Sequence, residues 1–440
     1  KNIARIIFLY PTRGTANEGF RDYISWAPEA DAALVHSTSA YELSGMFENP
    51  NDERSRKDFT TNDRLFALAY WQRRIFSATV DQFLGFMQHS YRSICLLPLL
   101  VDSVIVIDEV HSFDKSLFSV LKKFLNNFDV PVLCMTASLT YERQKELIDC
   151  SLTVFPQKEY FKDLKILTEM PRYNVHFLDN IDEVKKIIKN FTAKKVLWVV
   201  NTVSRCQKLG IEFKEALCYH SRFKISDRKR HHDNVISVFK PEQSHGILAI
   251  TTQVCEMSLD LDADIIISEI APITSIIQRM GRCNRHAHPE DNKIGEVYLY
   301  KPENSKPYKE DDMKGLDEFI KGINCKKISQ DDLGKLLEQY GPSEIEVERY
   351  AAFLESGPWA VTREESLRED DKFTVQAILD TDINDYLQCR SEKKPTDGLL
   401  VPVPYHCAER DNRIGNWPFV TDSSHYDARL GFLDKLKEKI

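Results

Sequence analysis

Two carboxylates and a histidine follow an apolar run in this chain, and their types and order make them candidates for chemistry on a nucleotide. Residues 104–107 read Val-Ile-Val-Ile, and Asp108, Glu109 and His111 come directly after them. An unbroken β-branched run predicts a strand buried on both faces of a parallel sheet, and open α/β sheets bind ligands at the carboxyl ends of their strands. An aspartate there can hold Mg²⁺ against phosphates, and the adjacent glutamate can orient an attacking water. Taken alone, the pair is equally compatible with a core strand that ends in a solvated acidic turn.

A second candidate is the segment 278–285, which reads Gln-Arg-Met-Gly-Arg-Cys-Asn-Arg. We predict a helix over 273–285, and spacings of four and three residues then place Gln278, Arg282 and Arg285 on one helix face. Two guanidiniums that point the same way suit phosphate oxygens, which accept planar, bidentate donors. A solvated basic face is the alternative. The embedded glycine and glutamine, together with the acidic strand end, favour phosphate.

A third candidate is the segment 251–262, which is weaker by itself. The hydroxyls of Thr251 and Thr252 at a strand end can bond a phosphate backbone, and the carboxylate of Asp260 can accept from ribose hydroxyls. Segments of this composition are often only turns.

These residues must be positioned by alternating strands and helices. Two such series, separated by a weak pattern at 151–163, predict an α/β fold with two doubly wound parallel sheets in tandem. We place the domains at 1–155, 156–301 and 302–440; the last is a linker with a small accessory domain of unassigned chemistry. The charged segment 48–63 is expected to be a surface loop. The predicted strands are 4–10, 75–79, 104–107, 130–135, 195–200, 246–251, 263–268 and 295–300.

Composition narrows the class of protein. A length of 440 residues is too great for one ordinary core, and a charged fraction of 29% is normal for a soluble protein. The net charge of −8 gives no global basic field, so any nucleic acid must bind in a local groove. The ten cysteines are scattered without C-x-x-C spacing, which favours reduced thiols in a cytoplasm over a zinc ribbon. No apolar run predicts a membrane span and no signal peptide is seen, so no membrane partner is expected.

The candidate motifs occur in a fixed order that resembles the superfamily-two helicases. Within that superfamily the chain is similar to the DNA helicase of type I CRISPR immunity, a helicase–nuclease recruited by the crRNA surveillance complex. The resemblance covers about two thirds of the chain, from Arg5 to Tyr300, and is weak again at 426–431. The stretches that carry it are 8–17, 79–84, 95–99, 108–114, 200–205 and 219–223.

The resemblance implies two RecA-like domains that bind ATP and Mg²⁺. It makes Asp108 the ligand of the Mg²⁺ of Mg-ATP, Glu109 the base that orients water, and His111 a sensor of nucleotide state. Asp260 would contact the ribose. Beside Gln278, the two arginines Arg282 and Arg285 would act as arginine fingers across the domain cleft. The coupling segment Thr136, Ala137 and Ser138 stands where the family has Ser-Ala-Thr.

The same resemblance implies a path for single-stranded DNA, the displaced strand of the target. Contacts of this kind go to phosphates and give affinity without sequence choice. The other implied partners are the crRNA surveillance complex and an HD nuclease, upstream or on a separate chain, in a prokaryotic cytoplasm. The implied DNA contacts are Pro11, Thr12, Arg13, Thr79, Asn201, Thr202, Ser221, Arg222, Thr251 and Thr252.

Two departures from the family pattern stand out. The chain has no G-x-x-x-x-G-K-[ST] loop, which the family places shortly before the first strand, that is, before Lys1. We therefore expect a longer parent protein, and no useful ATP hydrolysis by the chain as written. The HD nuclease domain is also absent. The pair His232-Asp233 lies in a basic run, 228–232, and we interpret it as a solvated or DNA-facing helix face.

The leading hypothesis is an ATP-driven single-stranded DNA translocase of type I CRISPR interference. One alternative is another superfamily-two helicase, acting on RNA or in repair. Residues 13–17 and 221–223 count against it. A second alternative is a non-hydrolysing nucleic-acid or effector-binding module that has lost the phosphate loop. Joint retention of Glu109, Arg282 and Arg285 counts against that one, because a dead ATPase has no use for them.

Overall fold

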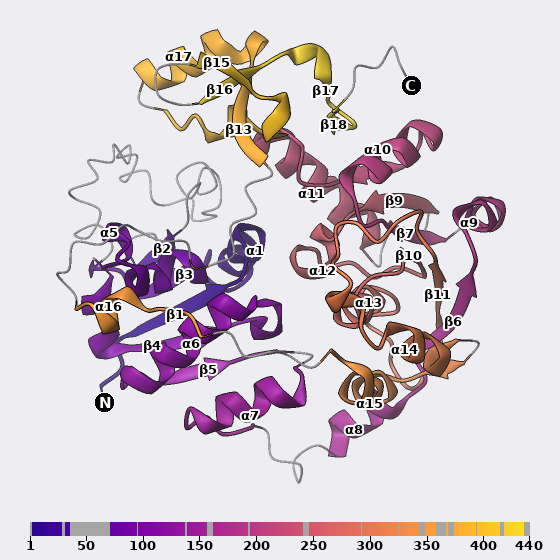
Figure 1. The fold of residues 1–440 in the computed structure, drawn as a ribbon, viewed down its shortest axis with the longest axis horizontal. Helices are drawn as coiled ribbons and strands as arrows, with labels where there is room; N and C mark the ends of the chain where they lie inside the picture. The colour runs from indigo at the N-terminus through magenta and orange to yellow at the C-terminus, as the bar shows by residue number, and fades with distance from the viewer. Residues whose placement is uncertain are drawn as a thin grey trace. The chain divides into compact units, whose positions relative to one another are not determined.

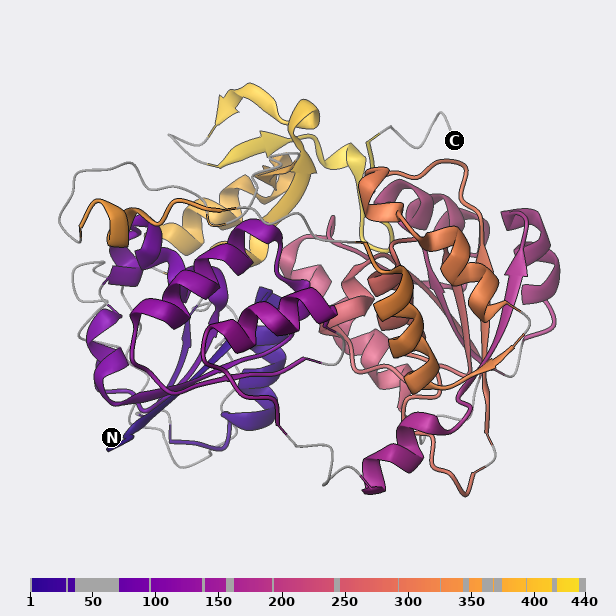
Figure 2. The same cartoon turned by 60° about the horizontal axis from the view of Figure 1, so that its bottom comes forward.

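The computed structural model describes most of the chain and is shown in Figures 1 and 2. It divides into two compact units, one of residues 1–154, 344–371 and 393–395, the other of residues 155–343, 372–392 and 396–440. The described residues are 2–28, 31–35, 71–94, 96–136, 139–155, 162–191, 194–240, 246–291, 293–324, 326–342, 348–357, 367, 374–392, 394–413 and 418–434.

A parallel five-stranded sheet, in the order β2-β3-β1-β4-β5, forms the centre of the first unit. Alternate residues of the central strands face opposite layers: Ile7 and Leu9 pack in the cluster that contains helix α6, whereas Tyr10 packs with helix α1. Burial on both faces explains the continuous apolar sequence of these strands. The elements are β1 (Arg5–Tyr10), α1 (Arg13–Tyr23), β2 (Ala32–Val35), β3 (Ile75–Thr79), α4 (Val80–Leu84), α5 (Tyr91–Ile94), β4 (Ser103–Ile107), α6 (Lys115–Asn127), β5 (Val132–Cys134), α7 (Tyr141–Asp149) and α16 (Ala352–Glu355).

The register of this sheet brings the ends of three strands to one edge. Tyr10 of β1 pairs with Thr79 of β3, and Leu9 pairs with Ile107 of β4. The residues that follow β1, β3 and β4 therefore leave the sheet side by side.

A seven-stranded sheet, in the order β12-β6-β11-β10-β7-β9-β8, forms the centre of the second unit. Its pairs are parallel except for the antiparallel edge pair β12–β6. The strands are β6 (Tyr173–Leu178), β7 (Lys195–Val199), β8 (Leu217–Tyr219), β9 (Ile247–Thr251), β10 (Ile265–Glu269), β11 (Gly295–Tyr300) and β12 (Lys327–Ile328). The helices are α8 (Lys162–Glu169), α9 (Ile181–Ile188), α10 (Val203–Glu212), α11 (Ile225–Phe239), α12 (Val254–Ser258), α13 (Ile273–Met280), α14 (Leu316–Ile323) and α15 (Gln330–Tyr340).

The C-terminal part of the chain adds a small mixed sheet, in the order β14-β13-β16-β15, and a two-stranded hairpin. The expected accessory region 302–440 is shared between the two units in this division of the chain. The elements are β13 (Thr374–Leu379), α17 (Ile383–Ser391), β14 (Leu400–Pro404), β15 (Glu409–Arg413), β16 (Phe419–Thr421), β17 (Tyr426–Asp427) and β18 (Gly431–Phe432).

The predicted α/β class with two parallel sheets is confirmed, but one helix is shorter than predicted. Helix α13 ends at Met280, not at residue 285, because Gly281 caps it and the main chain of Cys283 forms an isolated β-bridge with Ala263. The predicted shared helix face of Gln278, Arg282 and Arg285 is therefore wrong. The predicted loop 48–63 lies outside the described residues. Within the described part of the chain, no helix has the length and apolarity to cross a membrane.

Candidate functional site

The carboxylate pair lies where strand β4 leaves the first sheet. The Asp108 amide donates to the Leu9 carbonyl at 2.9 Å, so the main-chain ladder between β1 and β4 continues one residue past the strand. Glu109 then adopts a left-handed conformation, with φ of 53°, and a 3₁₀ turn, Val110–Ser112, follows. An unfavourable backbone conformation at a non-glycine residue is common at functional positions.

The Asp108 carboxylate fits a divalent cation. Its Oδ1 accepts a hydrogen bond from the Glu109 amide at 2.8 Å, whereas Oδ2 has no hydrogen-bond partner among the described residues. Burial, and then the neighbouring Glu109 carboxylate, raise the pKa of Asp108 above its ordinary value. Two half-buried carboxylates side by side destabilise each other's charge, and a Mg²⁺ held by Asp108 would relieve that repulsion.

His111 is a neutral imidazole next to this pair. Its Nδ1 lies 2.9 Å from the Thr136 hydroxyl and 3.2 Å from Glu109 Oε2. Burial, and then the nearby Arg143, lower the pKa of His111 to about 4, so in its contact with Glu109 the neutral ring donates from Nδ1 to the carboxylate. The buried Nε2 has no hydrogen-bond partner among the described residues. Thr136 thus contacts His111, while Ala137 and Ser138 lie outside the described residues; the coupling role of this segment stays a prediction.

Arg143 of α7 is a residue that sequence reasoning missed. It is 6% exposed, and its Nη1 donates to the carbonyls of His111, at 3.2 Å, and Phe113, at 2.8 Å. The guanidinium also lies over the Phe118 ring, 4.7 Å from its centroid. Arg143 therefore holds the turn that carries His111. No sequence signal marks it, because its partners are main-chain carbonyls that precede helix α6, whereas Arg143 lies on α7.

Four of the candidate DNA contacts share the carboxyl edge of the first sheet. Thr12 caps α1, and its Oγ1 accepts from the Thr15 amide at 3.2 Å. Pro11 is buried beside it, Arg13 is exposed, and Thr79 is 5% exposed at the end of β3. The structure brings these residues to the edge that carries Asp108, as expected for neighbouring parallel strands.

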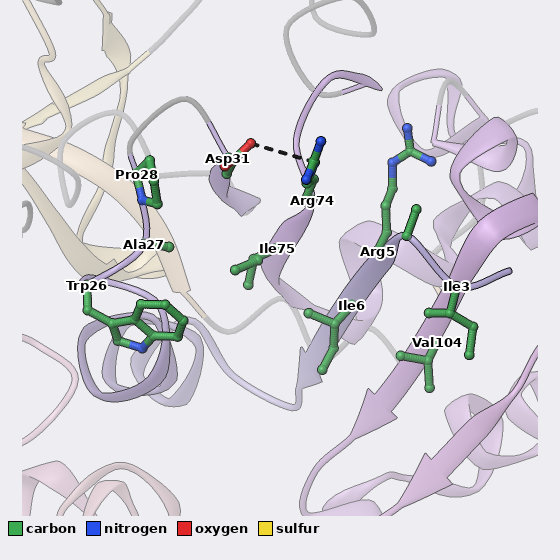
Figure 3. Close-up of a pocket in the computed structure, with 11 residues that line it drawn as sticks. Ile3, Arg5, Ile6, Trp26, Ala27, Pro28, Asp31, Arg74, Ile75 and Val104 are labelled. Atoms are coloured by element: carbon green, nitrogen blue, oxygen red, sulfur yellow. Dashed lines mark ion pairs between the residues drawn. The ribbon is translucent and has the colours of Figure 1, made fainter.

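A pocket on the same unit lies at the other edge of this sheet and does not belong to the site. Figure 3 shows its lining, which includes Arg5, Ile75 and Val104 from the beginnings of β1, β3 and β4. Asp108 follows the far end of β4.

In the second unit, Arg285 and Asp260 form a partly exposed pair. The Arg285 Nε lies 3.0 Å from Asp260 Oδ1, with side chains 40% and 68% exposed, and the Arg285 amide donates to Asp262 Oδ1 at 2.7 Å. A guanidinium held at the surface beside a carboxylate keeps donors available for a phosphate. The structure thus brings together two residues that the sequence assigned to one nucleotide.

Arg282 has different surroundings. It is 8% exposed, and its Nε donates to the Cys255 carbonyl at 2.9 Å while Nη2 donates to the Glu256 carbonyl. These bonds secure helix α12. Its expected function as a second arginine finger stays a prediction. Gln278 lies half-buried on α13, whereas Arg285 lies in the turn that follows this helix.

A buried ionic network, which sequence reasoning also missed, connects several motifs of this unit. Arg279 is fully buried, and its Nε donates to Glu256 Oε1 at 2.7 Å while Nη1 donates to Asn201 Oδ1 at 3.0 Å. Glu269 accepts from the Asn201 amide at 2.6 Å and from Arg205 Nη1 at 2.9 Å. Fully bonded buried charges of this kind fix geometry more than they add stability. Asn201, a candidate DNA contact, is 2% exposed within this network.

The remaining candidate DNA contacts differ in exposure. Thr202 caps α10, where it accepts from the Arg205 amide at 3.4 Å. Thr251 and Thr252 are 0% and 3% exposed, and the Thr251 hydroxyl donates to the Thr252 carbonyl at 3.3 Å. Thr251 has no exposed surface, and its carbonyl accepts from the Val200 amide at 2.9 Å, so its contact with DNA stays a prediction. Ser221 and Arg222 are half-buried in the loop after β8.

Sequence comparison confirms the resemblance drawn from the motifs. A family model described as "CRISPR-associated nuclease/helicase Cas3, C-terminal" matches residues 192–288. The chain is 35% identical over 344 residues to a putative CRISPR-associated nuclease/helicase Cas3 of Myxococcus xanthus, an alignment that covers 76% of the chain and 44% of that protein. A Cas3 of Streptococcus thermophilus is 25% identical over 356 residues, with 68% and 38% covered. The chain thus spans less than half the length of these relatives.

Solved structures agree on the fold. The AMPPNP complex of T. fusca Cas3 superposes with a TM-score of 0.69 at 18% identity, covering 98% of this chain and 62% of that one. A chain in the structure titled "CRISPR RNA-guided surveillance complex, pre-nicking" gives a TM-score of 0.56 at 16% identity, covering 93% and 62%. At these identities the likeness establishes a shared tandem α/β architecture.

Proposed function

We propose that this chain, a relative of the CRISPR-associated Cas3 helicases, forms the two RecA-like motor domains of an ATP-driven single-stranded DNA translocase of type I CRISPR interference. The observation that carries the proposal is that both candidate nucleotide-binding pairs are formed in the structure. One is the Asp108–Glu109 pair with a free carboxylate oxygen, and the other is the Asp260–Arg285 pair.

Each residue has a role that its surroundings permit. Asp108 would hold the Mg²⁺ of Mg-ATP, and the metal would neutralise charge on the phosphates. Glu109, in its left-handed turn, would orient a water, with the neutral His111 beside it. Asp260 would accept from the ribose, and Arg285 would donate to phosphate oxygens. The 440 residues contain no G-x-x-x-x-G-K-[ST] loop, so turnover is to be tested in a protein that joins them to one.

The strand edge and the loop after β8 would contact single-stranded DNA. The capped helix α1 presents Thr12 and Arg13 next to the nucleotide residues, and Ser221 and Arg222 lie at the surface of the second unit. A net charge of −8 makes these local contacts the source of affinity. By similarity to the relatives, the partners would be the crRNA surveillance complex, the displaced strand and a nuclease, in a prokaryotic cytoplasm.

A non-hydrolysing nucleic-acid-binding module is the second candidate function. Only the missing phosphate loop favours it. The free Asp108 Oδ2 and the left-handed Glu109 count against it, because a binding module does not need that strained turn. A superfamily-two helicase outside CRISPR immunity is disfavoured by the relatives, which are CRISPR-associated proteins.

The test is Glu109→Gln in a protein that includes a phosphate loop. Removing the base should lower DNA-stimulated ATP hydrolysis at least about 100-fold while a fluorescent ATP analogue still binds. The matched control is Glu338→Gln on α15, an exposed carboxylate, which should change neither quantity. Turnover retained by Glu109→Gln would overturn the proposal.

A further inference from the structure

The hairpin of β17 and β18, residues 426–432, is built into the second unit. In Figure 1 it lies beside α10 and α11. Leu430 and, just beyond it, Leu433 are 4% and 3% exposed in the hydrophobic cluster that contains Trp198 and Cys206. Gln207 of α10, 4% exposed, donates through Nε2 to the carbonyls of Leu430 and Phe432, both at 2.8 Å. The hairpin therefore has a fixed position on this unit.

The main chain of the hairpin packs closely against the loop 220–224, which follows β8. Gly431 has φ of +69°, and a Cβ at this position would lie 2.6 Å from the Arg222 carbonyl oxygen and 2.8 Å from His220 Cε1. Two constraints require glycine at this position: the left-handed backbone conformation and the close approach of the loop.

Hydrogen bonds from the hairpin fix this loop at three points. The Phe432 amide donates to the Arg222 carbonyl at 2.8 Å. His220 Nε2 donates to the Leu430 carbonyl at 3.1 Å, and its Nδ1 accepts from the Arg222 amide at 3.2 Å. The Tyr426 hydroxyl accepts from the Lys224 amide at 3.0 Å. Both sides of the half-buried loop tip, Ser221 and Arg222, are thus held by the hairpin.

A stack of three rings supports the loop from below. Phe223, fully buried, lies between His220, at 4.5 Å between ring centroids, and His231 of α11, at 4.3 Å. His231 Nε2 donates to the Ala428 carbonyl at 2.7 Å, so the hairpin also secures the far ring. Burial lowers the pKa of both histidines, which agrees with the neutral ring that the two bonds of His220 require.

We propose that the C-terminal hairpin is a positioning element for nucleic acid, which holds Ser221 and Arg222 ready to contact the phosphates of single-stranded DNA. This rests on the proposed function. The Arg222 guanidinium is itself oriented by Asp434, just beyond the hairpin, through one Nη1 bond. A guanidinium carries five N–H donors, so a phosphate can still be bound.

The experiment uses the full chain and a fluorescein-labelled oligothymidylate of about 20 nucleotides, longer than a typical single-strand site. Tyr426→Phe removes one hydroxyl and keeps the ring, and Gly431→Ala displaces the loop. We expect dissociation constants about 3-fold and about 10-fold larger, since a phosphate contact needs accurate placement. Gly334→Ala on α15, where a Cβ meets nothing within 4 Å, and Tyr141→Phe, at a 63% exposed ring, should stay within about 2-fold of wild type.

Two further readouts separate positioning from general loss of structure. Hydrogen exchange of the Lys224 amide should rise in Tyr426→Phe while exchange in β7 and β9 does not change. The slope of log affinity against log salt should fall by about one in Arg222→Ala, by the same amount in Gly431→Ala, and by no more in the double variant.

The outcomes distinguish this proposal from the proposed function. If Arg222→Ala weakens binding but folded Tyr426→Phe and Gly431→Ala bind like wild type, the hairpin proposal is overturned and DNA binding stands. If the wild-type chain does not bind the oligonucleotide, the DNA-binding function itself fails. If Gly431→Ala does not fold, Tyr426→Phe decides, because the phenyl ring preserves the packing.

Discussion

At the strand end, the properties of Asp108 and Glu109 follow from a few neighbouring groups. Each carboxylate raises the cost of charging the other, and the turn that carries His111 has a fixed shape because Arg143 bonds its carbonyls. Catalytic groups need such support, since a displacement of about 1 Å can cost about 100-fold in rate.

Replacing Arg143 by methionine tests this support. The change removes the bonds to the His111 and Phe113 carbonyls and leaves two buried acceptors without a partner. We expect the free energy of unfolding to fall by about 2–4 kcal/mol, and DNA-stimulated ATP turnover to fall further than the stability loss explains. Urea unfolding and steady-state ATPase assays measure the two effects. Lys145→Met, on the exposed side of the same helix, should alter neither; equal behaviour of the two variants would contradict the assignment.

Substitutions of Arg282 and Arg285 should have different effects on the free energy of unfolding and on ATP turnover. Arg285→Ala removes a partly exposed side chain, so stability should change by less than about 0.5 kcal/mol, while ATP turnover should fall about 1000-fold if it acts as a finger. Arg282→Ala leaves the buried carbonyls of Cys255 and Glu256 unpaired and should destabilise by about 2–3 kcal/mol. A reversed pattern would assign the finger to Arg282.

The sequence could single out Asp108, Glu109, Asp260 and Arg285 as candidates, because their residue types and order suit nucleotide chemistry; their roles stay predictions. It could not identify Arg143 or Arg279. Their partners are distant in sequence and are main-chain carbonyls or buried polar groups, so only the folded chain shows that these arginines are structural supports.

At the scale of the elements, helix α1 packs closely against β1. Gly19 of α1 lies where a Cβ would approach the Tyr10 hydroxyl to 2.1 Å, and Tyr10 is 4% exposed. The approach fixes the helix that Thr12 caps, and thereby the position of Arg13.

Gly19→Ala should therefore destabilise the first unit although alanine is the better helix former. We expect a loss of about 1–3 kcal/mol from overpacking, against about 0.5–1 kcal/mol gained from helix propensity. Gly334→Ala, in open space on α15, should be neutral or stabilising. Thermal unfolding followed by circular dichroism compares them, and equal midpoints would mean that Tyr10 moves aside freely.

Strand positions were predictable here because both faces of the central strands are buried, which gives continuous apolar runs such as 104–107. Strand β8 is an edge strand of three residues, and β6, which has only the two-residue β12 beyond it, alternates buried and half-buried residues; both lack the continuous apolar signal and were missed. The end of α13 was misplaced because Gly281 alone does not stop a helix. The bridge from Cys283 to Ala263, a tertiary contact, turns the chain away.

At the scale of the whole molecule, the chain combines two α/β units, and the C-terminal hairpin completes one of them. The accessory region was unassigned in sequence because, beyond the apolar strands β13 and β14, its described strands are the polar β15 and strands of two or three residues. Its hairpin is buried against α10, α11 and the loop after β8, and Phe432 also packs against β13 and β14 of the small sheet.

This packing predicts an acid-sensitive second unit. His220 is neutral when folded, with its pKa lowered to about 3 chiefly by burial, and with Arg222, His231 and Arg228 opposing its charge. The unfolded chain binds a proton near the ordinary value of 6.5, so this group's contribution is complete above pH 6.5 and is lost as the pH falls toward 3. When the pH falls from 7 to 5, the free energy of unfolding of His220→Asn should decrease by about 2 kcal/mol less than that of wild type, as measured by urea unfolding. Parallel losses would mean that His220 is protonated in the folded state.

The central claim is movement along single-stranded DNA driven by ATP. The most direct measurement is displacement of streptavidin from the end of a biotinylated oligonucleotide by a protein that joins these residues to a phosphate loop. We predict displacement with ATP and none with a non-hydrolysable analogue or with Glu109→Gln. Displacement at the same rate with and without ATP hydrolysis, or none in a protein that binds both ATP and DNA, would contradict the account.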